Sequence, residues 1–298
     1  PKPEAEYPGQ PLPYDPRNIW CVNYGMDTYD KLFTNRQLTA LTTFSALVAE
    51  AQQKAETDAI AAGMANDHLP LRDGGQGARA YGEAVGVYLA FAVDRQANYS
   101  SSLNGWSGDF IIQTFGRQAL PMVWDYAESN PFSNSTGNWS GAINWIIKAL
   151  DKFPSTGESY AQQFDAQCDC SLREVMVSTD PPYYDNIGYA DLSDFFYVWL
   201  RQSLKETYPE LFSTMLVPKA EELIATPYRH EGSMEKAKAF FEEGMLSACK
   251  QMYLYAREDI PVTIYYAYKQ SDSDADGSAS SGWETMLNAI IKAGFTIV

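Results

Sequence analysis

The sequence is poor in the residues that hold metal ions or cross-link a chain. Its 298 residues include four cysteines and two histidines. Cys168 and Cys170 have a single residue between them, whereas paired zinc-binding cysteines usually have about two to four. We therefore expect no metal site, and reduced thiols in the cytoplasm are the simplest interpretation of the cysteines.

Basic residues and long apolar runs are also scarce. Lys and Arg number 22 against 38 Asp and Glu, so the formal net charge is −16. Because DNA phosphates are gripped by clustered Lys and Arg, this chain is not expected to carry the main surface of a DNA-binding protein. No apolar run approaches the ~20 residues of a membrane span, and residues 1–16 read as a proline-rich linker without a signal-peptide pattern. With 45% hydrophobic residues, the chain is predicted to be globular and to have no membrane partner.

What the sequence does contain is a short apolar segment that runs directly into Asp180-Pro181-Pro182-Tyr183. Residues 175–177 are apolar and mostly β-branched, which predicts a buried strand. Proline cannot continue a central strand, so the chain is expected to leave the sheet at Pro181. Ligands of open α/β sheets bind at this carboxyl end of the strands. The tetrapeptide therefore stands where a site is expected.

The tetrapeptide has a chemistry of its own. Two prolines fix φ and remove two N–H donors, and residues that precede proline are held extended. The Asp180 carboxylate and a proline carbonyl can then accept hydrogen bonds from the two N–H groups of an exocyclic base amine. These hydrogen bonds would keep the lone pair of the amine on its nitrogen, where it can attack a methyl group. Tyr183 can stack on the base, which must first leave the duplex. The alternative is a simple turn at the end of a strand, because Asp-Pro and Pro-Pro are common turn formers.

Asp-Pro-Pro-Tyr is the catalytic motif of amino-methyltransferases that modify adenine N6 or cytosine N4 in DNA. The longer string 178–196 resembles the large adenine-specific DNA methylases that carry an N-terminal DUF1156 region. Segments 32–38, 115–125 and 282–285 are similar to the same family, so the resemblance spans nearly the whole chain. Members of that family are longer and have a glycine-rich cofactor loop upstream. The resemblance implies that this chain is an internal fragment, with the basic DNA-gripping surface in other parts of the protein.

The resemblance also implies a cofactor, S-adenosylmethionine. An acidic residue at the position of Asp165 is expected to hydrogen-bond the adenine amine of the cofactor. Phe33 and Thr34 resemble an element that touches its methionine end, although Asn35 replaces the usual proline. A solvated aspartate and a plain helix cap are the structural alternatives for these residues.

Four polar or aromatic residues after the tetrapeptide are candidates for the pocket of a flipped base. They are Tyr184, Asp185, Asn186 and Tyr189. The aromatic residues at 195–199 are expected to be helix core. The run Gly74-Gly75-Gln76-Gly77 precedes a helix but follows no buried strand, so we expect a flexible connection there and not a cofactor loop.

The predicted fold class is α/β, a partial Rossmann-like S-adenosylmethionine-dependent methyltransferase sheet with a large helical N-terminal region. The predicted division is a linker at 1–16, a mainly helical region at 17–158 and a truncated catalytic region at 159–298. Helices are expected at 33–63, 78–97, 110–128, 142–150, 191–204, 236–257 and 283–293. Strands are expected at 18–23, 161–164, 175–177, 261–268 and 295–298.

The function expected from these observations is methyl transfer from S-adenosylmethionine to the amino group of a DNA base, most simply adenine N6. In this scheme Asp180, Pro181, Pro182 and Tyr183 are the catalytic residues. Two alternatives stay open. One is an enzyme that methylates RNA or an amide nitrogen of a protein, and the other is a non-catalytic scaffold in a DNA-modification or defence system.

Overall fold

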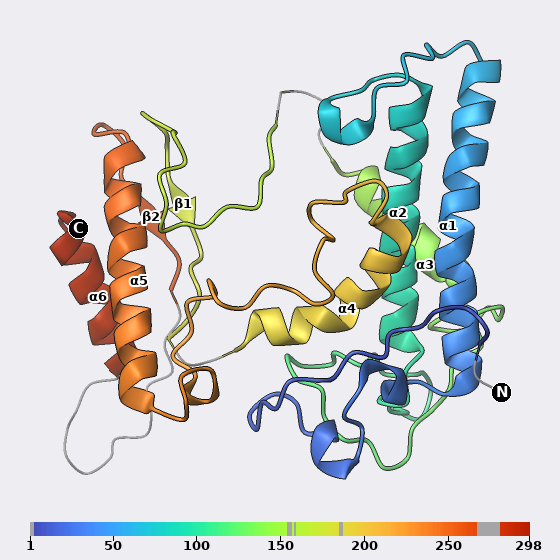
Figure 1. Ribbon diagram of the computed structural model, residues 1–298, viewed down its shortest axis with the longest axis horizontal. Helices are drawn as coiled ribbons and strands as arrows, with labels where there is room; N and C mark the ends of the chain where they lie inside the picture. Colours follow the sequence, from blue (N-terminus) through green and yellow to red (C-terminus); the bar gives the residue numbers. More distant parts are fainter. Residues whose placement is uncertain (1–2, 154–156, 158, 185–186, 267–280) are drawn as a thin grey trace. The chain divides into compact units, whose positions relative to one another are not determined.

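A computed structural model describes residues 3–153, 157, 159–184, 187–266 and 281–298 (Figure 1). The chain divides into two compact units. Unit 1 comprises Pro1–Gly157 and Tyr189–Pro218, and unit 2 comprises Glu158–Gly188 and Lys219–Val298. The segment Tyr189–Pro218 therefore counts with the N-terminal half, although it follows the Asp-Pro-Pro-Tyr motif in the sequence.

Unit 1 is built on helices. Its α-helices are α1 (Asn35–Ala61), α2 (Ala78–Tyr99), α3 (Trp139–Leu150) and α4 (Tyr189–Leu204), and its short 3-10 helices are η1 (Cys21–Tyr24), η2 (Tyr29–Leu32) and η3 (Leu71–Asp73). The long helices α1 and α2 lie side by side (Figure 1). Leu38, Leu41 and Val48 of α1 are buried at helical spacing. Gly82 and Gly86 of α2 allow close approach to α1 at Gln52.

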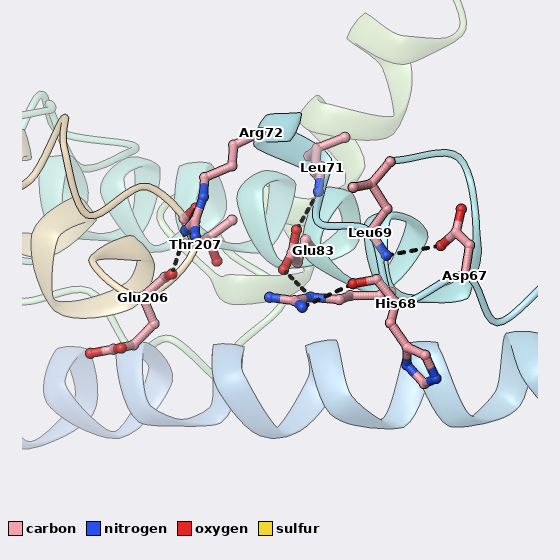
Figure 2. Close-up of polar contacts among 9 residues, drawn as sticks. Asp67, His68, Leu69, Leu71, Arg72, Glu83, Glu206 and Thr207 are labelled. Atoms are coloured by element: carbon pink, nitrogen blue, oxygen red, sulfur yellow. Dashed lines mark hydrogen bonds and ion pairs between the residues drawn. The ribbon is translucent and has the colours of Figure 1, made fainter. Parts of the chain in front are cut away.

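The connection between α1 and α2 is held by a buried carboxylate (Figure 2). Glu83 of α2 accepts from the backbone N–H of Leu71 at 2.6 Å and from Arg79 Nε at 3.0 Å. Arg79 also donates to the carbonyl of His68, and Arg72 reaches the carbonyl of Thr207 at 3.1 Å. These bonds give the polar loop a defined shape.

The glycine run 74–77 is explained by this packing. Gly74 has φ +82° and ends η3. A Cβ at Gly75 would lie 2.1 Å from the carbonyl oxygen of Leu69, and one at Gly77 would lie 2.4 Å from Oδ1 of Asp67. Local sterics thus favour glycine at each of these three positions. The run 74–77 connects η3 to α2.

Residues 100–138 contain no helix, although one was predicted at 110–128. Pro121 lies inside the predicted helix, where it removes an N–H donor and clashes with the preceding turn. The buried side chain of Asn104 organises the segment: its Oδ1 accepts from Ser101 N at 2.6 Å, and its Nδ2 donates to the carbonyl of Ile112 at 2.9 Å. The first residues of the chain also pack within unit 1. Leu12 is buried, and its N–H donates to the carbonyl of Asp27.

Unit 2 contains α5 (Met234–Tyr255), α6 (Ser281–Ala293), the 3-10 helix η4 (Pro227–Arg229) and the strands β1 (Ser178–Thr179) and β2 (Thr263–Ile264). The strands pair in parallel, with Ser178 opposite Thr263. Val177, Phe241, Met245 and Met286 are buried together between the strands and the helices. Figure 1 shows α5 and α6 beside each other.

The predicted α/β fold class is wrong for the residues that the structure describes. They form six α-helices and one parallel sheet of two short strands, with no Rossmann-like sheet. In unit 1 the apolar helix faces cover one another, so no sheet is needed to bury them. Among the described residues, the segment 161–164, expected to be a strand, is exposed and has no strand partner. The expected strand at 18–23 is reduced to a single bridge at Ile19 and the helix η1. Residues 295–298 are not paired with a strand either.

The remaining helices lie within a few residues of their predicted positions. No helix in the described ranges is both long and apolar enough to cross a membrane.

Candidate amine-binding site

The Asp-Pro-Pro-Tyr segment leaves the carboxyl end of a parallel strand pair. The pairing begins before β1, at a parallel bridge between Val175 and Ala256. Ladder bonds run from the N–H groups of Arg257, Thr263 and Tyr265 to the carbonyls of Val175, Val177 and Thr179, at 3.0, 3.0 and 2.8 Å. Residues 175–179 are therefore extended and paired, and Asp180 is the first residue beyond the ladder. The predicted exit point is present, but the strand β1 lies just after the predicted 175–177, and Met176, expected to be buried, is 69% exposed.

Asp180 itself is exposed. Its carboxylate has no hydrogen-bond or ion-pair partner among the residues that the structure describes. Pro181 and Pro182 are half-buried, and no N–H of the described chain donates to either proline carbonyl. This short segment thus presents several unused acceptors and, at the prolines, no donors.

The two tyrosines that follow are anchored by aromatic neighbours in unit 2. The ring of Tyr183 is half-buried and meets the ring of Tyr266 edge-on, with centroids 5.2 Å apart. The backbone N–H of Tyr184 donates to the hydroxyl of Tyr266 at 3.2 Å. Tyr266 in turn stacks on Trp283 at 6.2 Å. One aromatic residue just beyond β2 therefore fixes the chain immediately after the prolines.

Tyr184 is fixed on its other sides as well. Its carbonyl accepts from Ala225 N at 2.7 Å, and its ring meets Phe241 of α5 edge-on at 5.2 Å. A Cβ placed on Gly282 would lie 2.8 Å from Cβ of Tyr184, so the start of α6 needs a glycine to approach this residue. Tyr184, predicted to line a base pocket, has mainly a packing role.

A cavity of about 830 Å³ adjoins this aromatic group. Ile264, Tyr266 and Trp283 line one part of it, and Arg257, Glu258 and Asp259 contribute charged groups. Asp180 and Tyr183 are not among its lining residues. The cavity is therefore not the place where the four catalytic candidates converge, and Asp180 faces solvent.

The residues expected to hold S-adenosylmethionine do not fit that role. Phe33 is buried in unit 1, where its ring contacts Phe195 at 5.6 Å and Trp199 at 5.3 Å. The hydroxyl of Thr34 accepts from Gln37 N at 3.3 Å, and the Gln37 side chain accepts from Thr34 N at 2.8 Å. This capping box begins α1 and uses the polar groups that a ligand would need.

Asp165 is also occupied locally. It follows an exposed, unpaired segment, and its Oδ1 accepts from the N–H of Gln167 at 2.9 Å. The Asp165 side chain thus closes a turn that spans residues 165–167. Asp165 belongs to unit 2, whereas Phe33 and Thr34 belong to unit 1.

The remaining candidates are placed as follows. Tyr189 is exposed at the start of α4, in unit 1. Asp185 and Asn186 lie outside the described residues. Phe195 and Trp199 are fully buried, as expected of helix core.

Sequence reasoning missed Tyr266 and Trp283 as supports of the motif. Both lie in or beside segments that the sequence did single out, the strand at 261–268 and the string 282–285. Their position in the sequence could have identified them. An aromatic residue at the carboxyl end of a strand parallel to β1 lies next to the segment that follows β1. No family model matches the sequence, and the searches of curated proteins and of solved structures gave no match either.

Proposed function

We propose that residues 180–183 bind an exocyclic amino group of a DNA base and position it for methylation, most simply at adenine N6. The observation that carries the proposal is the set of unused acceptors at the end of β1. The Asp180 carboxylate is exposed and without a partner in the described chain, and two proline carbonyls beside it accept no hydrogen bond there. An amino group offers two N–H donors, which two such acceptors can take.

The rigidity of the segment favours this role over a plain turn. Prolines at 181 and 182 restrict the backbone from within, and the bonds of Tyr184 to Ala225 and Tyr266 hold the residue that follows. An acceptor pair fixed before the substrate arrives loses little freedom on binding, which is how positioning lowers a barrier. The half-buried ring of Tyr183 leaves part of its surface for a base.

The proposal is confined to the amine side of the reaction. The methyl donor implied by the resemblance is S-adenosylmethionine, but Phe33, Thr34 and Asp165 do not fit its binding. We propose that other residues of the full-length protein bind the donor. The same misfit favours a second candidate function, that of a scaffold in a DNA-modification system. Such a scaffold would contain the tetrapeptide but would not catalyse methyl transfer.

The test is transfer of a labelled methyl group to DNA by the full-length protein that contains this sequence, followed by nucleoside mass analysis. We expect N6-methyladenine, and we expect Asp180→Ala to reduce the rate by roughly 100-fold or more, the scale for removing one preorganised hydrogen-bonding group. Tyr183→Phe should retain most activity because it keeps the ring. Tyr183→Ala should lose about 5- to 100-fold, the value of one base–aromatic stack.

Asp169→Ala is the matched control. Asp169 is an exposed aspartate of unit 2 that pairs only with groups of its own turn, Arg173 and Ser171 N, so its removal should leave the rate unchanged. Transfer to RNA or to a peptide amide, with none to DNA, would move the proposal to the alternative substrates. DNA methylation at an unchanged rate in Asp180→Ala would refute the assignment of this residue, and a full-length protein without any transfer would support the non-catalytic reading.

A further inference from the structure

One face of unit 1 combines exposed aromatic rings with cations that have no acidic partner. We define the aromatic–cationic patch as Tyr88, Phe91, Arg95, Tyr99, Trp145 and Lys148, from α2 and α3. Trp145 is 57% exposed and Phe91 is 45% exposed. The guanidinium of Arg95 lies 5.0 Å from the ring centre of Trp145 and 5.5 Å from that of Tyr99. The Lys148 ammonium lies 5.3 Å from the same Trp145 ring.

The patch follows from helix geometry. At about 100° per residue, Tyr88, Phe91, Arg95 and Tyr99 share one face of α2. Gly82 and Gly86, which meet α1, fall on the opposite face. Helix α3 then adds Trp145 and Lys148 beside Arg95, because α2 and α3 are in contact.

The charges of the patch are not neutralised locally. Neither Arg95 nor Lys148 has an ion pair with a carboxylate in the part of the chain that the structure describes. The two acidic residues of α2 point elsewhere: Glu83 is buried and bonded to Leu71 and Arg79, and a carboxylate oxygen of Asp94 is buried without a hydrogen-bond partner. Burial raises the pKa of Asp94 well above its ordinary value. Helix α3 contains no acidic residue, and its C-cap residue Asp151 forms no ion pair among the residues that the structure describes.

In a chain with a net charge of −16, two unpaired cations on one exposed indole are a local exception. A partner that carries negative charge and flat apolar surface together matches this chemistry. Single-stranded nucleic acid supplies both, because each nucleotide carries a phosphate and a base with two stacking faces. A duplex hides those faces, and an apolar protein helix lacks the charge.

We infer that the aromatic–cationic patch binds single-stranded nucleic acid by stacking bases on Trp145 and its neighbours, while Arg95 and Lys148 contact phosphates. The inference is independent of the proposed function, since it concerns unit 1 alone and involves neither Asp180 nor a methyl donor. It gives an acidic chain a specific place for a strand whose bases are unpaired.

The test is fluorescence anisotropy of labelled oligothymidine, about 20 nucleotides long, with the complete chain at low salt. We expect the single strand to bind more tightly than a duplex of the same length. Trp145→Ala should weaken binding roughly 5- to 100-fold, the range for one lost stack. Lys148→Ala should lower the slope of log K against log salt by about 0.7, the value for one phosphate contact on a single strand.

Trp106→Ala is the matched control for Trp145. Trp106 is 59% exposed in the same unit, and no cation lies over its ring among the described residues, so this variant should bind as tightly as the wild type. Lys250→Ala, an exposed lysine of unit 2, is the control for charge. Circular dichroism of each variant confirms that it is folded.

Four results would overturn the inference. The first is no change in anisotropy at protein concentrations up to about 100 μM in 50 mM salt, where even non-specific DNA binding is usually detectable. The second is equal weakening by Trp145→Ala and Trp106→Ala. The third is binding of duplex as tight as that of single strand, because stacking requires open base faces. If Trp145→Ala instead abolishes self-association of the chain, the patch binds a second copy and the nucleic-acid assignment fails.

Discussion

Substitution of Gly82 by alanine should destabilise unit 1, although alanine is the better helix former. In a helix interior, replacing glycine by alanine ordinarily gains about 1 kcal/mol. At Gly82 a new Cβ would lie 2.7 Å from the backbone carbonyl oxygen of Gln52 in α1, and 3.1 and 3.2 Å from Cβ and N of Glu56. Backbone atoms of a packed helix cannot rotate away, so α1 and α2 must move apart.

The size of the effect follows from two opposing contributions. Forcing an extra carbon into a tight helix contact costs typically ~1–3 kcal/mol, against the gain of about 1 kcal/mol in helix propensity. We therefore expect Gly82→Ala to lower the free energy of unfolding by up to about 2 kcal/mol. For a unit of 150–250 residues, each kcal/mol shifts Tm by roughly 2–4 °C.

Gly86→Ala is the matched control in the same helix. Its Cβ would also approach closely, 2.8 Å from Oε1 of Gln52, but its other contacts with Gln52 are at 3.5 Å. The close atom is the end of a flexible side chain that can turn away, so this variant should be neutral or up to ~1 kcal/mol more stable. Urea unfolding followed by far-UV circular dichroism measures both variants. If Gly82→Ala is as stable as Gly86→Ala, the close packing of α1 on α2 at this position is refuted.

Two further predictions concern the cap of α1 and the buried thiols. Thr34→Ala should lower the free energy of unfolding by ~0.5–2 kcal/mol because it removes the capping box. Thr34→Ser should retain the capping box and its stability. Equal urea midpoints for the two variants would contradict the role of Thr34 as a cap. Burial raises the pKa of Cys21 and Cys249 from 9.0 to about 11, so the unfolded chain releases these protons first and their contribution to stability should be lost as pH rises from about 9 to 11. In native protein at pH 8, mass spectrometry should find the exposed Cys168 alkylated well before Cys21 or Cys249, and early labelling of Cys249 would contradict its burial.

The sequence predicted those elements whose signal is local. The cap at Thr34 and the helices at 33–63 and 78–97 depend on neighbours within one or two turns, and all three are present within a few residues of their predicted bounds. The exit of the chain from β1 at Asp180 is also a local matter, because proline excludes itself from a ladder. Each of these features can be read from a window of about ten residues.

The size of the sheet could not be read in this way. A β-branched and aromatic segment such as 261–268 predicts a strand, but not how many strands will lie beside it. Here α5 and α6 cover the short pair β1–β2, and the segment 161–164, rich in glutamine and without β-branched residues, stays exposed. Phe33 and Thr34 satisfy a core contact and a helix cap, and a residue pattern alone does not rank these uses against ligand binding.

The position of Asp180 depends more on helix packing than on β-sheet pairing. An isolated pair of strands as short as β1 and β2 is marginal in water, so the ladder alone cannot hold the carboxylate in place. Val177, the residue before β1, packs with Phe241 and Met245 of α5 and with Met286 of α6. Phe241 also contacts the ring of Tyr184, on the far side of the two prolines. The backbone that carries Asp180 is therefore held on both sides by one apolar cluster, through Val177 before the two prolines and Tyr184 after them.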